Sequence, residues 1–193
     1  MSEQTKKMTT IAMLTAISAV MITLIHFPLF PAAAFLQYDP ADVAILIGAF
    51  AYGPVAGVII TVLASAIQAF LLGGDGVYGF LMHTIASGVL AMTAGSIYRV
   101  RHTRMGAVLA LSAGTIMMGL VMMVANHFIT PAFMGAPVAV VDAMLIPVIL
   151  PFNLLKAGIN SVITFLVYKT VSRHVIHGEG WDKKVSRKAE NNG

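Results

Sequence analysis

Long apolar runs are the feature that most restricts the folds open to this chain. An apolar run without a charged residue extends from Met8 to Ile25, and further apolar runs follow with only short polar segments between them. Apolar residues make up 58% of the sequence and charged residues 10%, with a mean hydropathy of +0.86, which no ordinary soluble domain shows. A length of 193 residues leaves room for about six spans of ~20 residues. The sequence therefore predicts an all-α integral membrane protein with six transmembrane helices.

Several functional classes lack the residues that they need. The chain has no cysteine, which excludes disulfides, thiol catalysis and cysteine metal sites. No histidine pair stands at metal-ligand spacing on one helix, no serine–histidine–aspartate set can be assembled, and Gly73–Gly74 is not followed by the lysine of a phosphate-binding loop. The net charge of +4 comes from basic residues beside apolar spans, so it indicates membrane topology rather than nucleic-acid binding. We therefore expect no enzyme, no metal and no cofactor, with the lipid bilayer as the surroundings.

The expected helices follow from the apolar runs and from the residues that interrupt them. As one helix, the stretch 40–72 would measure about 50 Å against a hydrocarbon core of ~30 Å. Gly53–Pro54 is the natural break, because proline ends a helix that precedes it. We therefore expect helices over about 8–25, 40–52, 54–72, 78–98 and 106–127, and a sixth that runs to Lys169 from a start obscured by Pro147 and Pro151.

Residues 28–38 form an apolar, aromatic loop with two prolines, which cannot be regular helix. Asp39 is expected to cap the second helix, with Pro40 in its first turn and Asp42 favourable to the positive helix end. A signal peptide cleaved near Ala32–Ala34 is an alternative for the first run, but that run is longer than the usual apolar core of a signal.

Basic residues fix the expected topology. With six helices and a cytoplasmic N-terminus, eleven of the twelve lysines and arginines lie inside, and the twelfth is Lys156 in the membrane. The loops at 28–39, 73–77 and 128–138 then lie outside, and both termini are cytoplasmic. The expected organisation is a cytoplasmic N-terminus at 1–7, a six-helix substrate-binding domain at 8–170 in the cell membrane, and a cytoplasmic polar tail at 171–193.

A polar face within the last apolar helix marks the candidate site. Asn153, Lys156 and Asn160 lie three, four and seven residues apart, so they share one helix face. A charge at membrane depth costs at least ~2.5–3.5 kcal/mol, so such a residue normally serves a function. The alternative is a lysine that reaches the interface or pairs with Asp142 for structure alone. With Asn126 near the end of the fifth helix, these side chains suit a flat, hydrogen-bonding small molecule, whereas His83 is expected to be a packing residue.

Three motifs together resemble a known family. They are Tyr38-Asp39-Pro40-Ala41-Asp42-Val43, Gly53-Pro54-Val55-Ala56-Gly57 and Pro151-Phe152-Asn153-Leu154-Leu155-Lys156. With the apolar first loop, they resemble the substrate-binding S component of energy-coupling factor (ECF) vitamin transporters over most of residues 8–170, and the riboflavin-specific branch in particular.

The resemblance implies a membrane protein of a bacterium or archaeon that binds riboflavin from outside and delivers it inward with a transmembrane T component and two cytoplasmic ATPases. It implies docking of the T component on Ala12 and Ala16. It also implies flavin contacts from the last-helix motif, the end of helix five and the first loop, namely Asn153, Lys156, Asn126, Phe35, Leu36, Gln37, Tyr38 and Asp39.

One departure from that branch keeps other ligands open. Riboflavin members carry a lysine–asparagine pair late in the third helix, where this chain offers only Gln68 as a polar group. One alternative is therefore an S component for another vitamin or heterocycle. A second alternative is a membrane assembly subunit that transports nothing.

Overall fold

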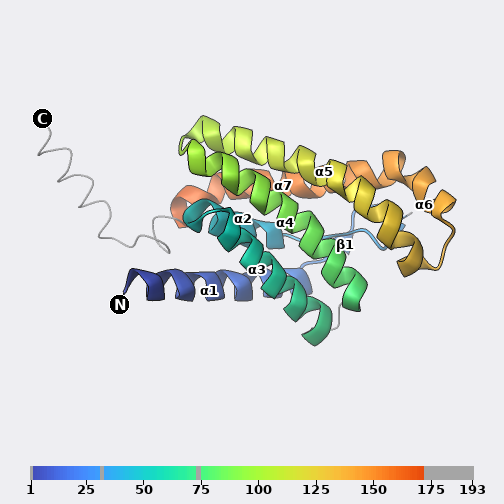
Figure 1. Ribbon diagram of the computed structural model, residues 1–193, viewed down its shortest axis with the longest axis horizontal. Helices are drawn as coiled ribbons and strands as arrows, with labels where there is room; N and C mark the ends of the chain where they lie inside the picture. Colours follow the sequence, from blue (N-terminus) through green and yellow to red (C-terminus); the bar gives the residue numbers. More distant parts are fainter. Residues whose placement is uncertain (1, 31–32, 73–74, 172–193) are drawn as a thin grey trace, which may run out of the picture.

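Six helices make up the part of the chain that the computed structural model describes, which is residues 2–30, 33–72 and 75–171 (Figure 1). Five are long and apolar enough to cross a membrane, and one is shorter. In chain order the elements are α1 (Glu3–Leu24), β1 (Phe27–Pro28), β2 (Gln37–Tyr38), α2 (Ala41–Tyr52), α3 (Pro54–Ala66) continued by the π-helical segment η2 (Ile67–Leu71), α4 (Gly76–Val100), α5 (Arg104–Met134), and α6 (Val138–Met144) continued by the π-helical segment η3 (Leu145–Ile149) and α7 (Leu150–Val171). The predicted all-α membrane fold with a short second helix is confirmed. Gly73–Gly74 and the tail from Ser172 lie outside the described residues.

The break between the second and third helices is confirmed at Gly53–Pro54. Gly53 has a φ of +93°, a conformation that glycine adopts without a steric penalty, and Pro54 begins α3. The reversal brings α2 against α3 so closely that a Cβ added at Gly57 would lie 2.7 Å from the Cβ of Ala49. The short α2 is consequently held inside the bundle, and every residue from Ala41 to Phe50 is buried.

The fifth helix is longer than its apolar pattern predicts. We expect an end near His127 and a loop over 128–138, but α5 continues to Met134 with Pro131 inside it. Proline lacks an N–H and removes one helical hydrogen bond, yet it does not end the helix here. The helix ends instead at Gly135, whose φ of +61° is left-handed and whose N–H donates to the Pro131 carbonyl. The extra turns carry Thr130 and Phe133 to the site described below.

The last helix begins at Val138, and neither of its prolines ends it. The helical stretch Val138–Tyr168 is continuous, with Pro147 inside η3 and Pro151 in the first turn of α7. A local change to π geometry is one way in which a membrane helix accommodates the missing N–H of proline.

The segment between α1 and α2 contains a short hairpin that the sequence analysis did not predict. β1 and β2 pair antiparallel, with Phe27 opposite Tyr38 and Pro28 opposite Gln37. The start of α2 also differs by one residue, because Pro40 occupies the N-cap that we expected for Asp39. The Asp39 carboxylate nevertheless accepts a hydrogen bond from the Ala41 N–H at 3.1 Å.

The two ends of the bundle differ in the elements that they carry. The N-terminus of α1 and the turn between α4 and α5 lie at one end, and α6 lies at the other (Figure 1). The core between them joins α2 to α4 and α5 through Leu46, Phe50, Leu90 and Leu111. These contacts hold α2, α4 and α5 together beside the cavity described next.

Candidate functional site

A cavity of about 310 Å³ opens among the ends of α1, α4, α5 and α7, beside the segment 35–39 and η2. Its volume lies at the lower end of the ~300–1,000 Å³ range of small-molecule sites. Aromatic and aliphatic side chains, among them Phe35, Tyr78 and Phe133, share its wall with amides, a carboxylate and an ammonium. This mixture suits a molecule with a flat apolar body and polar edges.

The structure brings almost all of the sequence-predicted binding residues to this one cavity. The lining includes Phe35, Leu36, Gln37, Asp39, Gln68, Asn126, Asn153 and Lys156. Tyr38 is the predicted residue that does not line it. Its side chain is buried, and its hydroxyl donates a hydrogen bond to Asn160 Oδ1 at 2.9 Å.

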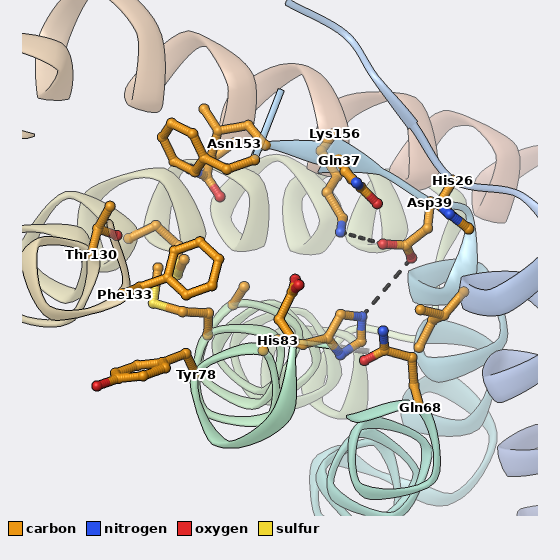
Figure 2. A pocket seen from close by; sticks show the side chains of 18 of the residues that line it. His26, Gln37, Asp39, Gln68, Tyr78, His83, Thr130, Phe133, Asn153 and Lys156 are labelled. Carbon is orange, nitrogen blue, oxygen red and sulfur yellow. Dashed lines mark hydrogen bonds and ion pairs between the residues drawn. The ribbon is translucent and has the colours of Figure 1, made fainter. Parts of the chain in front are cut away.

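Lys156 forms a buried ion pair with Asp39. Its Nζ lies 2.6 Å from Asp39 Oδ2, and the two side chains are 8% and 6% exposed (Figure 2). Burial alone would raise the pKa of the Asp39 carboxyl, but the Lys156 ammonium holds that pKa well below its ordinary value. The alternative pairing of Lys156 with Asp142 is wrong, because Asp142 Oδ1 instead lies 2.6 Å from His127 Nδ1 at a half-exposed position.

Asn160 ties the start of α2 to the same face of α7. Its Nδ2 donates to the Asp39 carbonyl and to Asp42 Oδ2, both at 2.9 Å, while its Oδ1 accepts from the Tyr38 hydroxyl. Ser87 on α4 donates to the other oxygen of Asp42 at 2.5 Å. The polar face on α7 thus holds the backbone next to the cavity as well as contributing to its wall. The cap expected for Asp39 and the favourable helix-end charge expected for Asp42 are therefore not the only roles of these two residues.

Two amides that line the cavity, one on α5 and one on α7, are oriented by their own helices. Asn126 Nδ2 donates to the Met122 carbonyl at 2.7 Å, and Asn153 Nδ2 donates to the Ile149 carbonyl at 2.8 Å. Thr130 donates to Asn126 Oδ1 at 2.8 Å. These bonds fix the amide positions, and Figure 2 shows Asn153 pointing toward the space that Lys156 and Phe133 also border.

Several residues that line the cavity were not among those predicted from the sequence. His83, which we expected to pack, lines the cavity from α4, and Tyr78, Thr130 and Phe133 line it as well. Polar residues at one-turn spacing were the available signal, since His83 stands four residues before Ser87 on α4. Phe133 was hidden because the fifth helix was expected to end before it.

The two alanines expected to contact a partner lie away from the cavity. Ala12 and Ala16 are exposed on α1, whereas Ala19, three residues further along, is buried. The outer face of α1 around these two alanines is therefore not covered within the described chain.

Comparison with known proteins agrees with the family resemblance that the three sequence motifs indicate. Residues 6–168 match the family model described as ECF transporter, substrate-specific component. The chain is 29% identical over 176 residues to a protein of Staphylococcus aureus named riboflavin transporter RibU, with 88% of this chain and 92% of the relative covered. It is 28% identical over 172 residues to riboflavin transporter FmnP of Bacillus subtilis, with 84% and 90% covered.

A solved structure gives the same result for the fold. The structure described as the S component of a bacterial ECF transporter aligns with a TM-score of 0.78 at 30% identity, over 88% of this chain and 96% of that one. The family is one of membrane transport components rather than enzymes. With a family model that matches nearly all of its membrane-spanning part, this chain belongs to the substrate-specific S components of ECF transporters.

Proposed function

We propose that this chain is the riboflavin-binding S component of an ECF transporter and mediates riboflavin uptake. The observation that carries the proposal is the cavity, which gathers the last-helix amide and lysine, the amide of α5 and the first-loop segment around one space. Two relatives that match most of this chain are named riboflavin transporters. Asn153, Lys156, Asn126, Gln68 and the segment 35–39 are the proposed contacts, with Tyr38 acting through Asn160.

The chemistry of the cavity suits a neutral flavin. Aromatic side chains can pack on the flat ring system, and the amides and Lys156 can donate to its carbonyl oxygens and ring nitrogens. Lys156 is the one lysine or arginine in the described lining, and it is already paired with Asp39, while Asp75 adds a further acid at the rim. An added phosphate group would meet this acidic surplus, so the site favours riboflavin over its phosphate ester.

Charge at the two ends of the bundle supports a cavity that opens outside the cell. Lys6, Lys7, Arg99, Arg101 and Arg104 stand at the end that holds the N-terminus and the α4–α5 turn. Positive residues favour the cytoplasmic side. We therefore place both termini inside, with 1–7 and 171–193 as cytoplasmic segments of the membrane domain 8–170.

Transport requires partners that this chain does not supply. Its sequence contains no phosphate-binding loop, so ATP hydrolysis belongs to two ATPase subunits, coupled through a transmembrane T component. The exposed small side chains of Ala12 and Ala16 allow a partner helix to approach α1 closely within the membrane. This face of α1 is the proposed contact with the T component.

A fluorescence titration of the purified chain with riboflavin tests the proposed ligand. We expect saturable quenching of flavin fluorescence at one ligand per chain, and weaker binding of the phosphate ester by about tenfold or more because of the acidic surplus. Other vitamins serve as controls in the same assay, as competitors. The proposal is replaced if riboflavin fluorescence does not change and another heterocycle raises the melting temperature of the protein. The chain is then an S component for that heterocycle, the alternative suggested by Gln68 in place of a lysine–asparagine pair.

A further inference from the structure

His83 is a partly buried polar residue of the cavity whose role is not explained by the contacts around it. It lies in the first third of α4, and its side chain is 11% exposed. One ring nitrogen, Nδ1, lies 2.8 Å from the Ser65 hydroxyl on α3. That hydrogen bond fixes the ring plane and turns the other nitrogen toward the cavity wall (Figure 2).

The second ring nitrogen has no hydrogen-bond partner in the part of the chain that the structure describes. Nε2 is buried, and the Asp39 Oδ1 atom lies 3.9 Å from it, which is within the range of an ion pair but beyond hydrogen-bonding distance (Figure 2). A buried polar atom without a partner is costly, and native structures retain such atoms mainly where they serve a function. The free chain therefore carries an unfavourable feature next to its binding site.

The neighbouring carboxylate decides which ring nitrogen carries the hydrogen. Asp39 lies on the Nε2 side of the ring, so its negative charge favours a hydrogen on Nε2. Nδ1 then accepts a hydrogen bond from the Ser65 hydroxyl. In this tautomer His83 presents a donor beside one oxygen of the Asp39 carboxylate, whose other oxygen pairs with the ammonium of Lys156.

We propose that His83 binds the substrate directly, with Nε2–H donating to an acceptor atom on the polar edge of the flavin ring, alongside Lys156. This inference rests on the proposed function, because it takes riboflavin as the ligand. Carbonyl oxygens and ring nitrogens of the flavin are acceptors, so a single edge of the ring can meet both donors. A ligand with only donors along that edge leaves the His83 hydrogen unpaired and is rejected.

Substitutions that separate the two ring nitrogens test the inference. His83→Leu removes both nitrogens, His83→Asn keeps a polar group near the Nδ1 position, and His83→Gln places an amide donor near the Nε2 position. We expect riboflavin affinity to fall about tenfold for the leucine and asparagine variants and to remain within about threefold of wild type for glutamine. His127→Leu is the matched control, because His127 is a half-exposed histidine outside the cavity.

The melting temperature of the ligand-free protein distinguishes binding from packing. Because His83→Leu also leaves the buried Ser65 hydroxyl without its partner, we combine it with Ser65→Ala, and we expect the ligand-free melting temperature of this double variant to stay level or rise while affinity falls. Unchanged riboflavin affinity in His83→Leu overturns the inference. A parallel loss of affinity and melting temperature that is also seen in His83→Gln overturns it as well. A wild-type protein that fails to bind riboflavin overturns the proposed function as well, so the two failures are distinguishable.

Discussion

Replacing Lys156 by methionine is expected to weaken riboflavin binding at least tenfold and to lower the melting temperature of the ligand-free protein. The substitution keeps most of the apolar stem but removes the ammonium that lies 2.6 Å from Asp39. The Asp39 carboxylate then stays buried without its partner, and breaking a buried ion pair in this way typically costs about 3–5 kcal/mol. Binding suffers separately, because a donor is lost from the cavity wall.

A double variant separates these two effects. Asp39→Asn combined with Lys156→Met leaves neither member of the ion pair charged. We therefore expect the double variant to recover most of the melting temperature that Lys156→Met loses. Riboflavin affinity is expected to remain low, since the donor is still absent. Thermal unfolding in detergent and fluorescence titration of the same samples provide both readouts. Wild-type affinity in Lys156→Met would remove this lysine from the proposed site.

Replacing Asn160 by leucine is expected to have the second large effect, although Asn160 does not line the cavity. Leucine has a similar size but makes none of the hydrogen bonds that join Asn160 to Tyr38, Asp39 and Asp42. Each buried polar group left without a partner costs roughly 1–3 kcal/mol. We expect a lower melting temperature and faster amide hydrogen exchange at the start of α2, with weaker riboflavin binding as the consequence.

Ile159→Leu is the matched control for Asn160→Leu. Ile159 is the preceding residue on α7 and is 38% exposed, so its replacement alters no buried polar contact. Exchange at residues 38–42 should remain as in wild type for the control. If Asn160→Leu leaves this exchange and the affinity unchanged, the network does not hold the first-loop segment in place.

Local patterns were sufficient to predict the architecture. The apolar runs predicted six helices, and the Gly53–Pro54 dipeptide predicted the break that makes the second helix short. Spacing along the last helix placed Asn153, Lys156 and Asn160 on one face, and all three are buried in the folded chain. These features depend on neighbours within one or two helical turns, which is the range over which sequence periodicity is informative.

The partners of those residues could not be predicted in the same way. Lys156 pairs with Asp39 over a separation of 117 residues, and no periodicity connects two such distant positions. Asp142 was the alternative partner for Lys156, but it lies beside His127. His83 was similarly underestimated, since its environment depends on α3 and on the segment before α2. The length of α5 was missed for a different reason, because a loop was expected over 128–138, where the helix instead continues to Met134 with Pro131 inside it.

The absorption spectrum of the protein, purified from cells grown in ordinary medium, tests the central claim most directly. A tight riboflavin-binding component retains ligand through purification, so we expect the visible absorption bands of a flavin at close to one per chain. A colourless protein that also leaves the fluorescence of added riboflavin unchanged would contradict riboflavin as the substrate, while the S-component fold would stand.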